Sequence, residues 1–273
     1  MIELPAAFPR RVDAFACDLD RTLIAEDAVL RPRTRAAIAA VRRAGVPFLI
    51  ATGRMVRSVR PYLDAAGIED PVVCYQGAVV AEADGRFLSH VPIPLELGRE
   101  AVRFVAGAGH HVNCYVGDEL YVAEVTPEAR AYADFQNLPI TPVGDLAEWL
   151  SEPPTKLVAV GDPLALDQLE GRAKAHFDGR LYISKSLPYF LEFASPEVTK
   201  AAGLEFLAEH LGFARERTVA FGDGENDVEL LEWAGFAVAV ETAHERVLAV
   251  ADLVCPPPGE EGVAQVLEAW LSR

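Results

Sequence analysis

The chain has 273 residues, of which 51% are hydrophobic and 24% are charged, enough for one large core or two modest ones. A formal net charge of −16 would repel a phosphate backbone and argues against a nucleic-acid partner. No signal-peptide pattern or apolar span of about 18 residues is evident, so we expect a cytoplasmic protein without a membrane partner. Nothing indicates an obligate protein partner, and the four scattered cysteines form no CxxC pair that would suggest zinc or disulfides.

The amino-terminal part predicts a strand, a helix and a second strand. Residues 13–17 (DAFAC) and 46–51 (VPFLIA) are short apolar runs, and the stretch 33–45 between them has helical character closed by Gly45. Such a unit is the beginning of a parallel sheet.

The carboxy-terminal part continues the same alternation of strands and helices. Strand-like runs occur at 72–75 (VVCY), 218–222 (TVAFG), 236–240 (FAVAV) and 252–255 (DLVC). The intervening segments 224–234 and 243–250 are helical in character. We therefore predict an α/β protein whose core, with a parallel sheet, consists of residues 1–86 and 191–273.

The middle of the chain, residues 87–190, has a different pattern and predicts an inserted α+β domain. Its proline-rich joints mark a separate unit. The expected elements, in order, are a helix near 95–107, a hairpin at 111–124, a helix near 127–137, a strand at 156–160, a helix near 164–176 and strands around 181–184 and 189–193.

Two carboxylates, Asp18 and Asp20, directly follow the first predicted strand. In parallel α/β sheets, ligands gather at the carboxyl ends of strands, and the repulsion between two carboxylates is tolerable beside a divalent cation. A calcium loop is excluded, because its sixth and twelfth positions would be Leu23 and Val29 instead of Gly and Glu. The pair suggests a Mg²⁺ site, with a polar strand end of no function as the alternative.

Thr52 and Gly53 follow the second predicted strand. A hydroxyl next to accessible backbone N–H groups suits a phosphate at a helix start, although Thr is also an ordinary helix cap. Further on, Lys200 opens a predicted helix, where a cation opposes the helix dipole and therefore calls for a reason. A solvated surface lysine is the alternative for Lys200.

The hexad 222–227 (GDGEND) follows another predicted strand. If a helix begins near residue 224, Asp223 and Asp227 approach one point from the same side. Acidic capping of a helix explains one acid but not the set, and a calcium loop again lacks its Gly and Glu. Together the four places supply carboxylates for a hard cation, a carboxylate nucleophile, and a hydroxyl and a lysine for phosphoryl oxygens.

The order of the motifs DLDRT, TGR, TK and GDGEND resembles the haloacid dehalogenase-like superfamily of phosphohydrolases, in particular its Cof-type branch, over essentially the whole chain. The resemblance implies a Rossmann-like parallel-sheet core with an α/β cap, here 87–190, inserted between the second and third motifs. The tail GEEGVAQVLEAW resembles the closing helix of that branch.

The resemblance also implies catalytic roles for four residues. Asp18 would be the nucleophile that forms an aspartyl-phosphate, and Asp20 would protonate the leaving group and then activate water. Thr52 and Lys200 would hold the phosphoryl oxygens.

For the metal, the resemblance implies a Mg²⁺ site made by Asp18, the backbone carbonyl of Asp20, and Asp223, with support from Asp227. Three further residues are expected near the phosphate: Gly53, Asn226 and Arg21.

The chain departs from the usual family pattern at three positions. Arg21 stands where Gly is usual, and Gln76 and Thr242 stand where Asn is common. Arg21 places a cation beside the nucleophile that either steers anionic substrates or points to solvent. The departures bear on substrate choice and efficiency more than on the type of reaction.

The expected function is therefore a Mg²⁺-dependent phosphatase of small phosphate monoesters, sugar phosphates among them. One alternative is a phosphomutase, which a related branch builds on the same kind of core. Another is a non-catalytic phospho-acceptor or ligand-binding regulator, against which the inserted region and Asp20 argue. The motifs HExxH and GxxxxGK[ST] are absent from the sequence, which argues against a zinc hydrolase and a P-loop ATPase.

Overall fold

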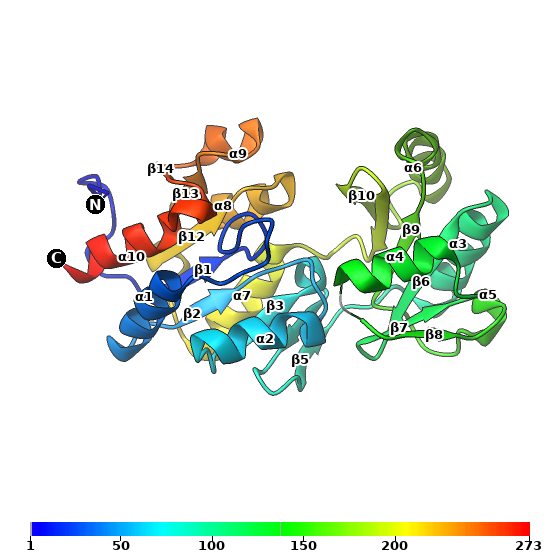
Figure 1. The fold of residues 1–273 in the computed structure, drawn as a ribbon, viewed down its shortest axis with the longest axis horizontal. Helices are drawn as coiled ribbons and strands as arrows, with labels where there is room; N and C mark the ends of the chain where they lie inside the picture. Colours follow the sequence, from blue (N-terminus) through cyan, green and yellow to red (C-terminus); the bar gives the residue numbers. More distant parts are fainter. Residues whose placement is uncertain (1, 137) are drawn as a thin grey trace. The chain divides into compact units, whose positions relative to one another are not determined.

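The computed structural model describes residues 2–136 and 138–273, so residue 1 of the expected core and the last residue of the expected helix 127–137 lie outside the described residues. The chain divides into two compact units (Figure 1). The core unit consists of Met1–Ser89 and Thr199–Arg273, and the cap unit of His90–Val198. The predicted α/β class is confirmed. The cap unit spans His90–Val198, where the sequence predicts an insertion at 87–190.

The core unit is built on a five-stranded sheet in the order β14-β13-β12-β1-β2, in which every neighbouring pair is parallel. The strands are β1 (Ala14–Cys17), β2 (Phe48–Ile50), β12 (Thr218–Gly222), β13 (Phe236–Val240) and β14 (Leu253–Cys255). Four of them are buried at every residue, because helices cover both faces, and such strands have continuous apolar sequences.

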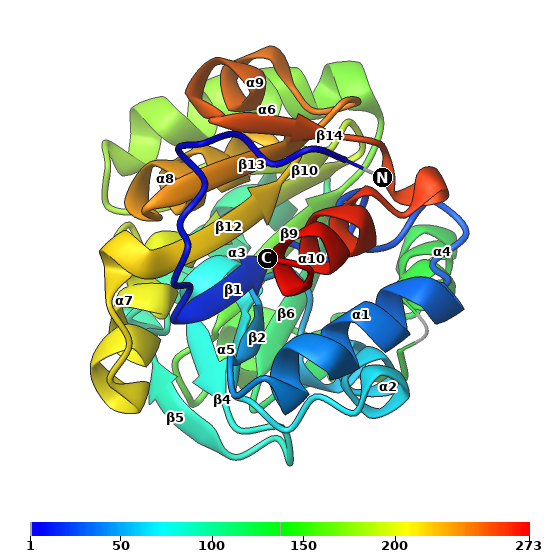
Figure 2. The same cartoon turned by 90° about the vertical axis from the view of Figure 1, so that its left-hand side faces the viewer.

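Helices lie on both faces of this sheet (Figure 2). They are α1 (Pro32–Arg43), α2 (Val56–Ala66), α7 (Lys200–Leu211), α8 (Val228–Trp233), α9 (Glu245–Val250) and α10 (Gly262–Leu271). Alternation along β1 assigns the faces: Ala14 and Ala16 share a buried cluster with α7 and α8, whereas Phe15 contacts Trp270 of α10 with ring centroids 5.2 Å apart.

A small sheet of β3 (Val72–Cys74), β4 (Val79–Ala81) and β5 (Phe87–His90) adjoins β2 through a bridge between Ala51 and Val73. The sequence predicted β3 but not β4 or β5. It also gave no prediction for α2, whose interior Pro61 is unfavourable in a helix.

Short 3₁₀ turns complete the core unit: η1 (Tyr75–Gly77), η2 (Arg215–Arg217), η3 (Glu225–Asp227) and η4 (Pro258–Glu260). One of them corrects a prediction. The helix expected at 224–234 starts as the turn η3 and becomes α-helical only at Val228, because the Asp227 side chain turns back onto backbone N–H groups.

The cap unit contains a six-stranded sheet in the order β10-β11-β9-β6-β7-β8, antiparallel except for the parallel pair β7 and β8. Its strands are β6 (His111–Val116), β7 (Glu119–Val122), β8 (Ile140–Pro142), β9 (Lys156–Val160), β10 (Tyr182–Leu187) and β11 (Phe190–Ala194). Its helices are α3 (Leu95–Gly107), α4 (Pro127–Gln136), α5 (Leu146–Trp149) and α6 (Pro163–Phe177).

The two faces of the cap sheet differ in polarity. Leu157 and Phe193 face an apolar cluster with α3, α5 and α6. The opposite face holds the buried pair Lys156 and Glu192, with Nζ and Oε2 3.3 Å apart.

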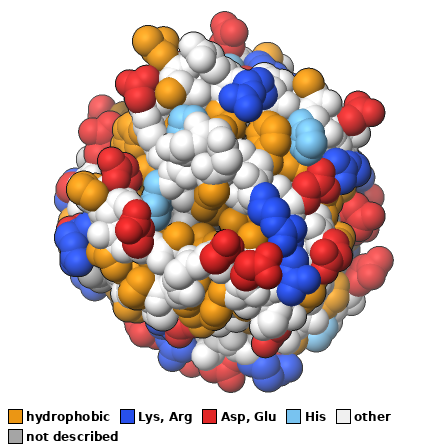
Figure 3. All heavy atoms as spheres, turned by 90° about the vertical axis from the view of Figure 1, so that its right-hand side faces the viewer, with side chains coloured by type: hydrophobic (Ala, Val, Ile, Leu, Met, Phe, Trp, Pro, Cys, Tyr) orange, Lys and Arg blue, Asp and Glu red, His pale blue; other side chains and the backbone are white. Residues whose placement is uncertain are grey.

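On the face of the molecule drawn in Figure 3, acidic and basic side chains are interspersed with apolar ones.

None of the helices within the described residues combines the length and the apolar character that crossing a membrane requires.

Candidate active site

The candidate site lies at the carboxyl end of the core sheet, where the strand order reverses. The connection from β1 leads through α1 to β2 on one side, and the connection from β12 leads through α8 to β13 on the other. β1 and β12 are neighbours, with Cys17 paired to Phe221. Asp18 and Asp223 therefore leave adjacent strands at the topological switch point, which is the usual ligand crevice of such sheets.

Three buried carboxylates meet at this point. Oxygen atoms of Asp18, Asp223 and Asp227 all lie within 4.8 Å of one another. Burial raises the pKa of Asp18 well above its usual value, although Lys200 opposes the shift. Burial, together with Asp227, raises the pKa of Asp223 to about 6. Both pKa values are raised chiefly because burial penalises the ionised carboxylates, and a bound cation would favour the ionised forms.

Lys200 is the buried cation of the site. It is 1% exposed, and its Nζ donates to Oδ1 of Asp18 at 2.5 Å and to Oδ1 of Asp227 at 2.6 Å. Burial alone would lower the pKa of Lys200, but the two carboxylates outweigh it and raise the pKa. These contacts explain why a lysine stands at the start of a helix: Lys200 is ionised and bridges the carboxylates of Asp18 and Asp227.

Close packing of α7 on β3 places Lys200 at this depth. A Cβ atom on Gly203, one turn after Lys200, would stand 2.5 Å from Cγ1 of Val73. Only glycine allows the helix to approach the strand this closely. Thr199 begins the helix, and its hydroxyl accepts the N–H of Ala202.

Asp227 is held by its own loop. Its Oδ2 accepts the backbone N–H groups of Asp223 at 3.0 Å and Gly224 at 2.9 Å, while Oδ1 binds Lys200. This fold-back requires Gly222, because a Cβ there would lie 2.6 Å from the Cβ of Asp227. Asp227 therefore positions Lys200 and the loop, and both of its oxygens are already hydrogen-bonded.

The donor set fits a divalent cation. Three carboxylates surround one buried ammonium, and oxygen ligands with excess negative charge are what hard cations prefer. Asp223 is also oriented from outside the cluster: the hydroxyl of Thr22 donates to its Oδ1 at 2.9 Å, and Arg21 lies 3.2 Å from its Oδ2. Such an orienting contact is typical of metal-ligating carboxylates.

The structure places the carboxylate of Asp20 in a different environment from that of Asp18. Arg54 binds it with both arms of its guanidinium, Nε to Oδ2 at 2.8 Å and Nη2 to Oδ1 at 2.5 Å. Arg54 also contacts Tyr62, donating to its hydroxyl at 3.3 Å. Asp20 is half-exposed and anchored to the loop that follows β2.

The other predicted phosphate-binding residues form a hydrogen-bonded group. The Thr52 hydroxyl accepts the N–H of Arg54 at 3.2 Å, and the Thr52 carbonyl accepts the N–H of Gln76 at 3.0 Å. Gln76 packs over Gly53, and its Oε1 accepts from Nδ2 of Asn226 at 2.9 Å. Gln76 thus connects the loop after β2 to the loop after β12.

Two functional candidates were not singled out from the sequence, Thr22 and Arg54. Both lie inside the quoted motifs DLDRT and TGR, which was the available signal. Of the family departures, Arg21 and Gln76 lie in the site, whereas Thr242 is exposed.

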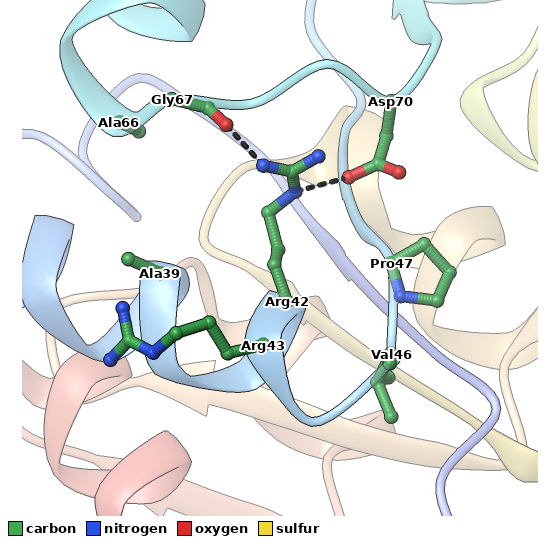
Figure 4. A pocket seen from close by; sticks show the side chains of 9 residues that line it. Ala39, Arg42, Arg43, Val46, Pro47, Ala66, Gly67 and Asp70 are labelled. Atoms are coloured by element: carbon green, nitrogen blue, oxygen red, sulfur yellow. Dashed lines mark hydrogen bonds and ion pairs between the residues drawn. The ribbon is translucent and has the colours of Figure 1, made fainter.

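A separate hollow of about 460 Å³ lies beside α1 and α2 (Figure 4). Val46 and Pro47, in its lining, precede β2, so it lies at the opposite end of the sheet from Asp18. Its Arg42 is held by Asp70 at 2.8 Å and by the carbonyl of Gly67. This arginine joins α1 to the end of α2.

Comparison with known proteins places these residues in a family context. The sequence model described as haloacid dehalogenase-like hydrolase matches residues 15–267. The 5-amino-6-(5-phospho-D-ribitylamino)uracil phosphatase of Bacillus subtilis is 29% identical over 266 residues, covering 94% of this chain and 97% of that protein. The pyridoxal phosphate phosphatase of Escherichia coli is 27% identical, with the same two coverages of 94% and 97%. A crystal structure from Thermotoga maritima matches with a TM-score of 0.86 at 30% identity, covering 94% of this chain and 97% of that one.

Proposed function

Since the chain belongs to the haloacid dehalogenase-like hydrolases, we propose that it is a Mg²⁺-dependent phosphatase that hydrolyses small phosphate monoesters through an aspartyl-phosphate on Asp18. The observation that carries the proposal is the cluster of Asp18, Asp223 and Asp227 around Lys200 at the switch point of the sheet. The full-length similarity to two phosphatases supports the same reaction.

In the first step, an oxygen of Asp18 attacks phosphorus. The new bond joins this oxygen to phosphorus, and the bond from phosphorus to the substrate oxygen breaks. Asp20, protonated for this step, gives its proton to the departing alcohol oxygen. Lys200 donates to an oxygen of Asp18 and would offset the charge of the phosphoryl group, and the Thr52 hydroxyl would donate to a phosphoryl oxygen.

In the second step, Asp20 is ionised and takes a proton from water. The water oxygen attacks phosphorus, the bond to Asp18 breaks, and inorganic phosphate leaves. A Mg²⁺ ion held by Asp18, Asp223 and the backbone of Asp20 would neutralise charge between the carboxylate and the phosphate. The pair with Arg54 holds the Asp20 carboxylate in one orientation for the second step, and must open for the first.

Phosphate release would test the proposal. The panel contains sugar phosphates, nucleotides and cofactor phosphates, each with Mg²⁺ or with chelator. We expect metal-dependent release by the wild type and a loss of at least roughly a thousandfold in Asp18→Asn, because the amide is no nucleophile. Asp64→Asn, an exposed carboxylate on α2, is the matched control and should keep full activity.

Three outcomes would contradict the proposal. Equal release by the wild type and Asp18→Asn would remove Asp18 from the reaction. Conversion of a sugar phosphate into its isomer, without free phosphate, would identify the phosphomutase alternative. Binding of Mg²⁺ and phosphate analogues without any turnover would favour a regulator.

A further inference from the structure

Arg21 occupies a backbone position that favours glycine. Its φ is +62°, in the left-handed region, which costs a side-chain-bearing residue roughly 1 kcal/mol. The conformation is fixed by a tight turn: the N–H of Arg21 donates to the carbonyl of Ile24 at 2.8 Å, and the N–H groups of Leu23 and Ile24 donate to Leu19. The turn needs this conformation, yet the chain carries an arginine in it.

The arginine side chain reaches the acidic cluster. Its Nη2 lies 3.2 Å from Oδ2 of Asp223, while the guanidinium side chain is 58% exposed. It is therefore an ion pair with one buried and one solvent-accessible member. Strained residues that persist beside a cluster of chemical groups frequently have a function there.

We propose that Arg21 is an exchangeable cation that competes with the divalent metal for Asp223 and thereby sets the metal affinity of the enzyme. The proposal rests on the metal site of the proposed function. In the metal-free enzyme Arg21 offsets part of the excess negative charge. When a cation binds Asp223, the attraction between the carboxylate and the guanidinium weakens. The free energy lost from this ion pair opposes metal binding and raises the Kd for the metal.

Exposure decides which of the two cations at the site can exchange. Lys200 is 1% exposed and bridges two acids, so moving it would leave charges buried without partners. Arg21 can turn its guanidinium into water at little cost, because more than half of its side chain is already exposed. The metal therefore displaces Arg21 and leaves Lys200 in place.

Titration calorimetry with MgCl₂ on the substrate-free and phosphate-free enzyme would test the inference. Arg21→Gln removes the charge but keeps a polar side chain in the same turn. Because solvent around the Arg21 side chain weakens the pair, we expect the Kd of this variant for Mg²⁺ to fall by about two- to fivefold relative to the wild type. Arg21→Gly also removes the guanidinium, and should show the same tightening without the backbone cost.

A matched control separates direct competition from a general charge effect. Arg246 is 63% exposed and pairs with Glu225 in the neighbouring loop. Arg246→Gln removes the same charge without touching Asp223, and its Kd should equal that of the wild type. Equal tightening in Arg21→Gln and Arg246→Gln would overturn the inference.

Asp223→Asn distinguishes failure of this inference from failure of the proposed site. We expect this variant to weaken Mg²⁺ binding by at least roughly tenfold. If it binds Mg²⁺ as the wild type does, the metal site itself is wrong. If it binds weakly while Arg21→Gln shows an unchanged or higher Kd, the site stands and competition by Arg21 is wrong.

Discussion

Asp20 and Arg54 form a two-armed ion pair at the edge of the acidic cluster. Nε and Nη2 of the guanidinium bind Asp20, Nη1 donates to the Tyr62 hydroxyl, and the guanidinium carbon lies 5.2 Å from the centroid of the Tyr62 ring. Arg54 is therefore placed to orient Asp20. A planar fork of two donors holds a carboxylate in one orientation, which a single ammonium does not.

Arg54→Lys should accordingly reduce kcat with little change in KM. We expect a fall in kcat of about tenfold, because a loosely held acid and base loses part of its contribution to proton transfer. Tyr62→Phe keeps the ion pair and is the control, with kcat near that of the wild type. Steady-state kinetics on the best substrate of the panel measures both. A raised KM with unchanged kcat would show that Arg54 binds substrate instead.

The individual residues show what sequence can predict about such a site. Asp18 and Asp223 follow apolar runs, and the parallel-sheet rule brings the ends of such runs together. The pairing of Asp20 with Arg54 joins residues 34 positions apart through two loops, and no periodicity encodes it. The burial of Lys200 was equally hidden, because its sequence neighbourhood is compatible with a surface helix start.

At the scale of elements, helix α7 and strand β3 fix the depth of the site. Gly203 lies within α7, where propensity alone would favour Ala by about 1 kcal/mol. The close approach to Val73 reverses that preference, because a Cβ would stand 2.5 Å from its Cγ1. The same helix carries Lys200 one turn earlier, so a shift of α7 would displace the Lys200 ammonium.

We therefore expect Gly203→Ala to destabilise the protein by about 1–3 kcal/mol and to lower activity. Val73→Ala should restore part of both in the double variant, since it makes room for the new methyl group. A Cβ on Gly171 of α6 would meet no atom within 4 Å, so Gly171→Ala should instead stabilise the protein. Urea unfolding measures the single variants and the double variant. Destabilisation that Val73→Ala does not relieve would exclude the contact as the cause.

Elements with clear periodicity were predictable, and those set by tertiary contacts were not. The helix at 95–107 coincides with α3 because its apolar positions recur at helical spacing. Helix α2 is not predictable from its periodicity, because Pro61 obscures the pattern. Helix α8 starts at Val228, later than the sequence predicts, because the Asp227 side chain accepts backbone N–H groups of the preceding turn. Strands β4 and β5 are short and carry no alternating pattern long enough to identify them.

At the scale of the whole molecule, the two units carry carboxyl groups whose pKa values are shifted in opposite directions. In the cap, hydrogen bonds from Arg180 and His176 lower the pKa of Glu100 to about 2. In the core, burial and Asp227 raise the pKa of Asp223 to about 6. The lowered pKa of Glu100 means that its ionised carboxylate stabilises the fold above about pH 4.5. This contribution is lost as the pH falls toward about 2. The raised pKa of Asp223 contributes stability that is fully present below about pH 4. That contribution is lost as the pH rises through about 6.

The metal-free core should therefore become less stable as the pH rises from about 4 to about 7. The contribution of Asp223 is on the order of 3 kcal/mol, since each pKa unit corresponds to roughly 1.4 kcal/mol. Trp149→Phe leaves Trp233 and Trp270, both in the core unit, so thermal unfolding followed by fluorescence reports that unit alone.

In EDTA we expect the Tm of Trp149→Phe to fall over this pH range, and to fall less when Asp223→Asn is added, because the amide does not titrate. Mg²⁺ should raise Tm more at about pH 7 than at about pH 4, since the ion binds the ionised carboxylates. The same fall in both variants would attribute the pH dependence to the general charge of −16 instead of the acidic cluster. The cluster thus lowers the stability of the metal-free core at neutral pH, and a bound cation removes that cost.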